Sequence, residues 1–285
     1  MIISAHAYAK LNLSLDIVSR MDNGFHNMKM VMQTIDLCDE ITIKCNPGEN
    51  KISIDAGLPF LPRGDKNIAV KAAKAFFAHT EISGYNTNIR IVKNIPVCAG
   101  MGGGSADAAA VLRALDEMFS TDLGSDTLRA IGLTIGSDVP FCIEGGTQLA
   151  EGQGEILTKL PPLPATHFVV CKPPFSCSTP QLFSLVRCEK IRAHPDTAGL
   201  IAALENGDLG GIARRMYNVF EDILPRGRSD IDHIKDKLLD FDALGAVMTG
   251  SGPTVFGIFE NKNHAHAAYE SLKTEYNDCF LAKSK

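Results

Sequence analysis

The glycine-rich segment at residues 96–105 constrains the fold of this chain more than any other part of the sequence. It reads Pro-Val-Cys-Ala-Gly-Met-Gly-Gly-Gly-Ser, with four glycines in the five positions from Gly100 to Gly104. Glycine loses more backbone entropy on folding than any other residue, so this density indicates positive φ angles or the close approach of a ligand. An alanine-rich helix is predicted directly after the loop, at residues 105–119.

A glycine loop that leads into a helix is suited to binding phosphate. The first N–H groups of a helix have no acceptor within the helix, and the helix dipole places partial positive charge at the same end. One such interaction contributes only ~0.3–1 kcal/mol when exposed, so several amides must converge on the anion. A flexible connector is the alternative interpretation, and it explains this density of glycines poorly.

Two common phosphate loops do not match the segment. A Walker loop ends in Gly-Lys-Ser/Thr, whereas Gly104 is followed directly by Ser105 without a lysine. The dinucleotide pattern Gly-x-Gly-x-x-Gly fails as well. Its last glycine position holds Ser105 when counted from Gly100 and Asp107 when counted from Gly102.

Strict alternation of polar and apolar residues predicts a strand at residues 10–17. One face of this strand carries Lys10, Asn12, Ser14 and Asp16. The other carries Leu11, Leu13, Leu15 and Ile17, which we expect to face a core. A solvated polar face is the simplest interpretation of the first set.

Other elements follow from the same periodicities. Strands are predicted at residues 41–44, 52–55, 87–93, 167–172 and 246–249, and from the turn at 250–253 to residue 259. Helices are predicted at residues 67–79 and 125–135, with a break at 136–140 and a loop at 94–104. The proline-rich residues 159–164 indicate a boundary, so we expect one domain at 1–158 and another at 159–285.

Composition narrows the class of protein. The chain has 285 residues, of which 45% are hydrophobic and 21% charged, as in globular proteins, and no apolar run reaches the ~20 residues that cross a bilayer. A net charge of −5 gives no basic field for nucleic acid. Without a targeting segment or a Cys-x-x-Cys pair, we expect a cytoplasmic protein with reduced thiols, no membrane partner and no nucleic-acid partner.

Three segments resemble the motifs of the GHMP kinase superfamily, in the same order along the chain. They are Ala-Lys-Leu-Asn-Leu at residues 9–13, the glycine loop, and Thr-Gly-Ser-Gly-Pro-Thr-Val-Phe at residues 249–256. The resemblance implies an α+β, two-lobed fold. Its N-terminal lobe, with a mixed sheet and helices, would carry the phosphate loop and bind ATP, and its C-terminal lobe would be an α/β sandwich-like domain.

Three further segments narrow the resemblance to a branch of the superfamily whose substrate carries cytidine diphosphate. They are Asn-Gly-Phe-His at residues 23–26, Ile-Gly-Ser-Asp-Val-Pro-Phe at 135–141 and Ala-Glu-Gly-Gln-Gly-Glu at 150–155. The resemblance implies transfer of the terminal phosphate of ATP, with Mg²⁺, to a hydroxyl of a small molecule. A GHMP kinase acting on a smaller alcohol, of the homoserine or mevalonate type, is the alternative. We expect a monomer or a weak homodimer.

The resemblance also implies the catalytic residues. Asp138 would accept or orient the proton of the attacking hydroxyl, and Lys10 would lie beside it, keep the carboxylate ionised and draw the reacting groups together. Asn12 shares the strand face of Lys10 and would contact the substrate. Without the resemblance, Asp138 would be interpreted as a turn or cap residue and Lys10 as a solvated lysine.

The remaining expected contacts fall into two groups. ATP would be bound by Pro96, Ala99, Gly100, Gly102, Gly103, Gly104 and Ser105, with Asn67 and Lys93 at the adenosine. The substrate would be bound by Phe25 and His26, as stacking ring and cytosine reader, and by Thr179, Phe183, Gly250 and Ser251. Phe25 stands where the family usually has tyrosine, which leaves the stacking face unchanged. Core packing is the alternative interpretation of the aromatic residues.

Metal ligation and one acidic residue stay open at this point. We expect Mg²⁺ to be held mainly by the phosphates of ATP, with Ser105 as a candidate ligand, helix cap or phosphate contact. Asp107 follows one turn into the phosphate-binding helix, where a carboxylate would repel the ligand unless it faces away or meets the metal.

Overall fold

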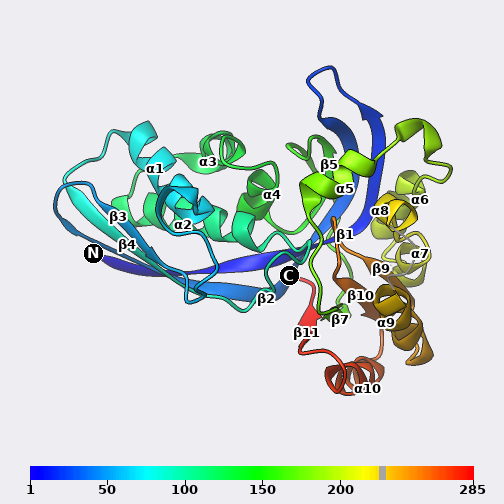
Figure 1. The fold of residues 1–285 in the computed structure, drawn as a ribbon. Helices are drawn as coiled ribbons and strands as arrows, with labels where there is room; N and C mark the ends of the chain where they lie inside the picture. The colour runs from blue at the N-terminus through cyan, green and yellow to red at the C-terminus, as the bar shows by residue number, and fades with distance from the viewer. Residues whose placement is uncertain (225–228) are drawn as a thin grey trace. The chain divides into compact units, whose positions relative to one another are not determined.

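The computed structural model describes residues 1–224 and 229–285, and the chain divides into two compact units that are interleaved in sequence. Unit 1 contains Met1–Ala9, Leu37–Ile95 and Gly102–Gly145, and unit 2 contains Lys10–Asp36, Pro96–Met101 and Gly146–Lys285. Two long strands, β1 (Ile2–Arg20) and β2 (His26–Pro47), pass from one unit into the other (Figure 1).

The sheet of unit 1 is built on the second half of β2. The strand β4 (Tyr85–Val92) pairs with it antiparallel, from Glu40 opposite Val92 to Pro47 opposite Tyr85. The short strand β3 (Ile52–Asp55) runs parallel to β4. Ile41, Ile43, Ile89 and Ile91 are buried on one face, which is the period-two pattern of a half-buried sheet.

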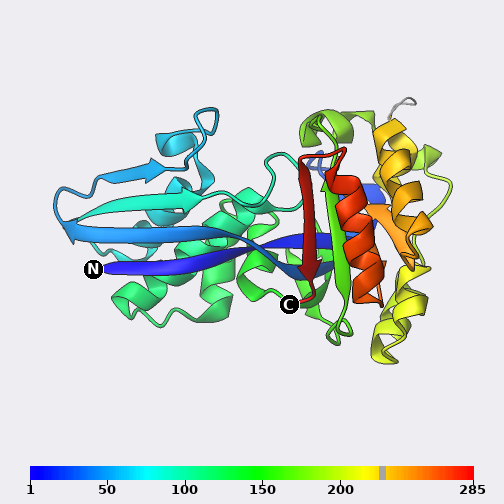
Figure 2. The same cartoon turned by 90° about the horizontal axis from the view of Figure 1, so that it is seen from below.

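Helices cover one side of these strands, as Figures 1 and 2 show from two directions. They are α1 (Ile68–Thr80), α2 (Gly103–Phe119), α3 (Gly124–Leu133) and α4 (Val139–Glu144), preceded by the 3-10 turn η1 (Gly64–Lys66). The N-terminal half of α2 is rich in buried alanine, including Ala106, Ala108, Ala109 and Ala110. Small side chains let α1 and α4 pack closely against it.

In unit 2, the first half of β2 pairs antiparallel with β5 (Thr147–Gly152), and β5 pairs antiparallel with β6 (Ile156–Lys159). The second half of β1 pairs in parallel with the two-residue strand β8 (Tyr217–Asn218), with Ser14 opposite Tyr217.

A separate four-stranded antiparallel sheet of unit 2 has the order β11-β7-β10-β9. Its strands are β7 (His167–Lys172), β9 (Gly245–Met248), β10 (Val255–Phe259) and β11 (Asp278–Lys283). The helices α9 (Ser229–Asp240) and α10 (Lys262–Lys273) pack against it. The remaining elements are α5 (Thr179–Leu185), η2 (Cys188–Lys190), α6 (Thr197–Glu205), α7 (Leu209–Ala213) and α8 (Val219–Ile223).

The predicted α+β class is confirmed, and β3 and β7 have the predicted bounds. The strands β1 and β2 are much longer than predicted, and α4, which was not predicted, begins at Val139 near the end of the predicted break. The strands β5, β6, β8 and β11 have no counterpart among the predicted elements. The domain boundary after residue 158 stays a prediction, because the compact units divide the chain in a different way.

The alternation of β1 is confirmed, and the alternative interpretation of its polar face as solvated is wrong. Lys10 is 4% exposed, Asn12 and Ser14 are 0% and Asp16 is 7%. Leu11, Leu13, Leu15 and Ile17 are buried on the other face as predicted. Burying a polar side chain is unfavourable unless it is hydrogen-bonded, so a strand that is buried on both faces indicates a built polar site.

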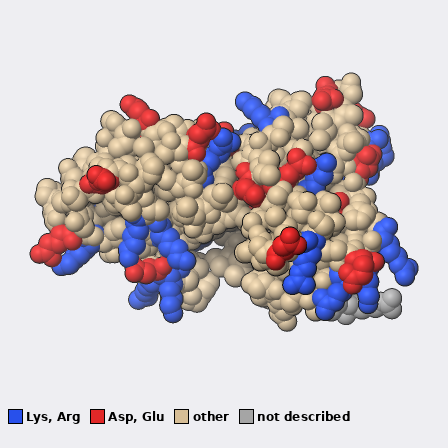
Figure 3. All heavy atoms as spheres, turned by 90° about the horizontal axis from the view of Figure 1, so that it is seen from above, with Lys and Arg blue, Asp and Glu red and all other residues tan. Residues whose placement is uncertain are grey.

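The surface and the helices fit the composition. On the face shown in Figure 3, lysine and arginine side chains are interspersed with aspartate and glutamate. An anion meeting this face would depend on local groups rather than on a field of one sign. Within residues 1–224 and 229–285, no helix has the length and apolar character that crossing a bilayer requires.

Candidate active site

The first half of the glycine loop packs backbone to backbone against the turn after β9. Gly100 has φ +76°, and a Cβ there would lie 2.3 Å from the carbonyl oxygen of Thr249. Gly250 has φ +56°, and a Cβ on it would lie 2.5 Å from the carbonyl oxygen of Gly100. Both distances are shorter than any Cβ contact tolerates, so both positions require glycine.

The buried polar face of β1 joins the same turn. The Lys10 amide donates to the Met101 carbonyl at 3.0 Å, and the Asn12 amide donates to Thr249 Oγ1 at 2.9 Å. The Lys10 ammonium donates to Asn12 Oδ1 at 2.5 Å. Strand, loop and turn therefore meet at Lys10 and Asn12, two of the residues predicted for the site.

Asn218 also holds this turn, and no motif or periodicity in the sequence pointed to it. Its Nδ2 donates to the carbonyls of Met248, at 2.7 Å, and Gly250, at 2.9 Å. Asn218 is buried on β8, beside β1. Only the fold brings this asparagine to a turn that lies far along the chain.

The turn is also connected to α5. Thr179 Oγ1 and Ser251 Oγ are hydrogen-bonded at 2.6 Å. One turn further along α5, the Phe183 ring stacks on His26, with centroids 5.2 Å apart and planes 29° apart. Its edge contact with Phe220 holds the ring at a second point, with centroids 5.0 Å apart. Phe183 therefore combines packing with a stacking position, whereas Phe25 beside His26 is 59% exposed.

The surroundings of His26 favour its neutral imidazole form. Partial burial, and then the positive charge of Arg20, lower the pKa of its imidazole from the ordinary value near 6.5. A neutral imidazole has one N–H donor and one bare nitrogen acceptor, which suits it to read the hydrogen-bonding edge of a nucleobase.

The second half of the glycine loop belongs to unit 1 and begins α2. Gly102, with φ 69°, occupies the N-cap position, so the interpretation of Ser105 as the cap is wrong. A glycine takes this left-handed conformation without the strain that a side chain would add. Gly103, Gly104 and Ser105 form the first turn, whose N–H groups have no acceptor within the helix.

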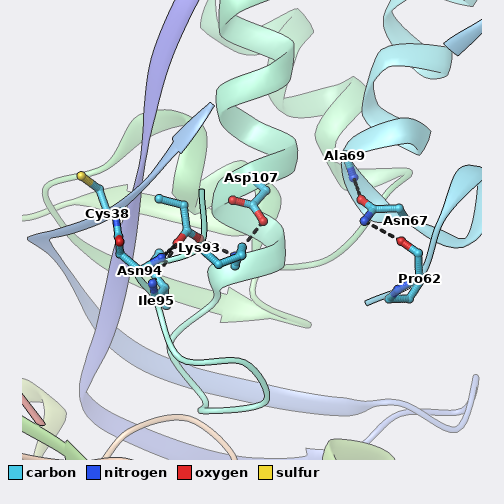
Figure 4. A network of polar contacts seen from close by, with 9 residues as sticks. Cys38, Pro62, Asn67, Ala69, Lys93, Asn94, Ile95 and Asp107 are labelled. Carbon is cyan, nitrogen blue, oxygen red and sulfur yellow. Dashed lines mark hydrogen bonds and ion pairs between the residues drawn. The ribbon is translucent and has the colours of Figure 1, made fainter. Parts of the chain in front are cut away.

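Asn67 and Lys93 both have local partners in unit 1 (Figure 4). Asn67 is the N-cap of α1, since its Oδ1 accepts from the Ala69 amide at 2.9 Å, and its Nδ2 donates to the Pro62 carbonyl. The Lys93 ammonium is paired with Asp39 and, at 2.8 Å, with Asp107 Oδ2. Their roles toward adenosine stay predictions.

Asp107 therefore faces Lys93 and not open solvent. Burial, together with the neighbouring Asp39 and against the favourable effect of Lys93, raises the pKa of Asp107 to about 7. The Lys93 pKa is itself raised above its usual value, because the two carboxylates outweigh the effect of burial. The open question about Asp107 is answered for the free chain: its side chain accepts a hydrogen bond from Lys93.

Asp138 lies at the start of α4, and its carboxylate does not cap that helix. The far end of α4 is fixed by Arg113 of α2, whose guanidinium donates to the carbonyls of Cys142, at 2.6 Å, and Ile143, at 3.3 Å. Gly132 of α3 also packs against α4, because a Cβ on it would lie 2.8 Å from Val139. Asp138 is thus carried by a short, well-anchored helix.

The predicted residues fall into two groups. Unit 2 brings together Lys10, Asn12, Gly100, Thr179, Phe183, His26, Gly250 and Ser251 through the contacts above, and it also contains Pro96, Ala99 and Phe25. Unit 1 contains Asn67, Lys93, Gly102, Gly103, Gly104, Ser105 and Asp138. Lys10 and Asp138 belong to different units.

The described residues contain no cluster of three or more histidine, cysteine, aspartate or glutamate side chains that could hold a metal. Mg²⁺ keeps several waters in nucleotide sites and is bound through phosphates with few protein ligands. A Mg²⁺ ion held by the phosphates of ATP needs few protein oxygens, and the hydroxyl of Ser105, in the first turn of α2, is compatible with the role of one protein ligand.

Comparisons with known proteins identify the family of the chain. Residues 67–146 match the model of the GHMP kinases N terminal domain, and residues 200–278 match that of the GHMP kinases C terminal domain. The chain belongs to the GHMP kinase family.

Within this family, the chain is similar to relatives that bear the name of one particular kinase. The chain is 43% identical to the 4-diphosphocytidyl-2-C-methyl-D-erythritol kinase of Acetivibrio thermocellus over 99% of both chains. It is 41% identical to the same kinase of Clostridium botulinum over 98% of both. A crystal structure of 4-(cytidine 5'-diphospho)-2C-methyl-D-erythritol kinase superposes with a TM-score of 0.83 at 28% identity, covering 99% of each chain.

Gly100 and Gly250 bring two main chains into direct contact, which we call the backbone crossing. This crossing predicts that Gly100→Ala destabilises the folded chain. The left-handed φ costs about 1–2 kcal/mol with a side chain, and the overlap with Thr249 adds about 1–3 kcal/mol. The matched control is Gly207→Ala, where φ is +64° and a Cβ would meet no described atom within 4 Å. Urea unfolding should show the larger loss for Gly100→Ala, and equal losses would refute the crossing as the cause.

The raised pKa of Asp107 predicts a pH-dependent stability. Between about pH 4 and pH 7 the folded chain holds a proton on Asp107 that the unfolded chain has released, so the free energy of unfolding falls as pH rises. The slope is about 1.4 kcal/mol for each pH unit and ends near pH 7. Urea unfolding from pH 5 to 8 should show this slope in the original chain and not in Asp107→Asn.

Proposed function

We propose that the chain is an ATP-dependent kinase that phosphorylates the 2-hydroxyl of 4-diphosphocytidyl-2-C-methyl-D-erythritol, in the methylerythritol phosphate route to isoprenoid precursors. Relatives that are 41–43% identical over nearly the whole chain bear the name of this kinase. The structural observation that carries the proposal is the continuous path in unit 2 from the glycine loop, through Asn12 and Ser251, to the His26–Phe183 stack.

The glycine loop is proposed to bind the phosphates of ATP. Its glycines bring backbone N–H groups close to the anion, and the first turn of α2 adds its free amides and positive dipole. Bound Mg²⁺ would neutralise charge on the phosphates. Phosphoryl transfer depends mostly on positioning and electrostatic stabilisation, and amides held by backbone packing require little rearrangement when charge develops.

Asp138 is proposed to accept the proton of the attacking hydroxyl, and Lys10 to keep that carboxylate ionised. The buried Lys10 side chain is held in place by Asn12, so its position does not depend on solvent. The anchoring of α4 by Arg113 gives Asp138 a fixed backbone. Transfer is direct and in line, and no covalent intermediate on the enzyme is required.

His26 and Phe183 are proposed to bind the cytidine end. Aromatic rings stack with their faces offset at centroid distances of about 4.5–7 Å, and a cytosine ring has the same kind of face. The neutral His26 supplies both a donor and an acceptor for the base. The exposed Phe25 ring beside it would close over the base without needing a hydroxyl.

Solved homoserine and mevalonate kinases share the fold of this chain. This likeness concerns the fold alone and is no argument that the chain acts on a smaller alcohol. The chain superposes on a homoserine kinase from Cytophaga hutchinsonii with a TM-score of 0.77 and on the L. major mevalonate kinase with 0.76, at 19% and 18% identity. A substrate without a base leaves the His26–Phe183 stack without a function. We further propose a cytoplasmic monomer or weak homodimer that requires Mg²⁺.

The role of Asp138 is tested by Asp138→Asn. Loss of a general base lowers the rate by about 10²–10⁴, so kcat should fall at least ~100-fold while the dissociation constant for ATP is unchanged. Asp126→Asn, an exposed acid of α3 in the same unit, is the matched control and should keep full activity. Unchanged turnover in Asp138→Asn would remove Asp138 from the mechanism.

The cytidine site is tested by truncating its aromatic rings. Phe25→Ala, His26→Ala and Phe183→Ala should each raise KM for the cytidine substrate about 5-fold or more and leave KM for ATP unchanged, because base stacking contributes about 1–3 kcal/mol. Phe60→Ala removes another exposed aromatic ring, 71% exposed, and serves as the control. If none of the variants at positions 25, 26 and 183 changes KM for the cytidine substrate, the assignment of that substrate is wrong, while the assignment of the chain as a kinase is unaffected.

A further inference from the structure

Asp39 was not among the predicted site residues, yet it organises the entry to the glycine loop. Its side chain, on β2, is 0% exposed. Oδ1 accepts hydrogen bonds from the backbone amides of Asn94, at 2.6 Å, and Ile95, at 2.8 Å. Oδ2 pairs with the Lys93 ammonium. One carboxylate therefore holds three consecutive residues, the last three before the loop begins at Pro96.

The same lysine reaches the far end of the loop. Lys93 Nζ donates to Asp107 Oδ2 of α2 at 2.8 Å, and Figure 4 shows the two side chains pointing toward one another. The start of α2 also lies directly on this segment. A Cβ on Gly103 would be 3.1 Å from Ile95 Cγ2 and 3.5 Å from Lys93 Nζ. Residues just before and just after the loop are thus fixed to each other within unit 1.

We propose that Asp39 is a positioning residue for ATP binding: with Lys93 and Asp107 it fixes the separation of the two ends of the glycine loop. The proposal rests on the proposed function, in which this loop binds the phosphates. Both oxygens of Asp39 are occupied by groups of the chain, and the residue is inaccessible to ligand. Asp39 acts only through the residues that it holds.

A loop with fixed ends has fewer conformations to lose when its amides converge on phosphate. Ordering a flexible binding loop on association lowers affinity, whereas a loop that is ordered beforehand avoids this loss. Glycines make the backbone of this loop unusually free, so restraint at its two ends adds to the contact that Gly100 makes inside the loop. Lys93, with a carboxylate on each side of the loop, provides that restraint electrostatically, in a buried setting where screening by salt is weak.

The test compares Asp39→Asn and Asp39→Ala with Asp116→Asn. Asparagine at position 39 keeps an oxygen for the amides of Asn94 and Ile95 but loses the ion pair, and alanine loses both. Asp116 also uses its carboxylate to hold nearby chain, since it accepts hydrogen bonds from the Thr121 hydroxyl at 2.6 Å and from the Leu123 amide at 3.1 Å. It lies at the other end of α2 from the glycine loop. It controls for loss of a structural carboxylate.

We expect KM for ATP to rise about 10-fold in Asp39→Asn and further in Asp39→Ala, while KM for the cytidine substrate stays within twofold. Asp116→Asn should leave both KM values unchanged, even if its thermal stability falls. A lower melting temperature of Asp39→Asn with KM for ATP within twofold of the original chain would overturn the proposal.

Amide hydrogen exchange without ligand separates this proposal from the proposed function. In Asp39→Asn, exchange of the amides at residues 94–104 should speed up at least about 5-fold, and in Asp116→Asn it should not change. Unchanged exchange in Asp39→Asn overturns the positioning role directly. If the original chain fails to bind ATP in calorimetry, the proposed function fails, and faster loop exchange in Asp39→Asn would still show the restraint.

Discussion

The crossing of two backbones at Gly100 and Gly250 is the constraint on which the rest of the candidate site depends. Neither position has room for a Cβ, so the glycine loop and the turn after β9 are in van der Waals contact through their main chains. The amides of Lys10 and Asn12 bond to the two partners of this crossing. The glycine loop, the buried Lys10 and the first residues of the path to His26 are therefore fixed by one contact between two glycine main chains.

Features with a local physical cause could be predicted from the sequence. The glycine loop, the helix after it and the apolar face of β1 follow from backbone freedom and from hydrophobic periods of two and 3.6 residues. The extra length of β1 and β2 could not be read in the same way. In β1 the polar face of residues 10–16 is buried as well as the apolar face, so the alternation that normally marks a solvated surface had a different meaning.

Residues whose roles depend on distant partners were beyond the reach of sequence reasoning. Asp39 is an ordinary acid before a predicted strand until the fold places the amides of Asn94 and Ile95 over it. Asn218 likewise acquires its role only when β8 lies beside β1. The puzzle of Asp107 had the same origin, because its partner Lys93 had been assigned to a ligand and not to the chain itself.

The interleaving of the two units has a consequence for biosynthesis. Residues 10–36 belong to unit 2, but most of that unit, residues 146–285, leaves the ribosome after unit 1 is complete. At translation rates of about 5–20 residues per second, roughly 10–50 seconds pass between the synthesis of the polar face of β1 and that of its partners Asn218 and Thr249. A nascent chain in that interval exposes residues 10–17, a strand segment that is buried on both faces in the folded protein.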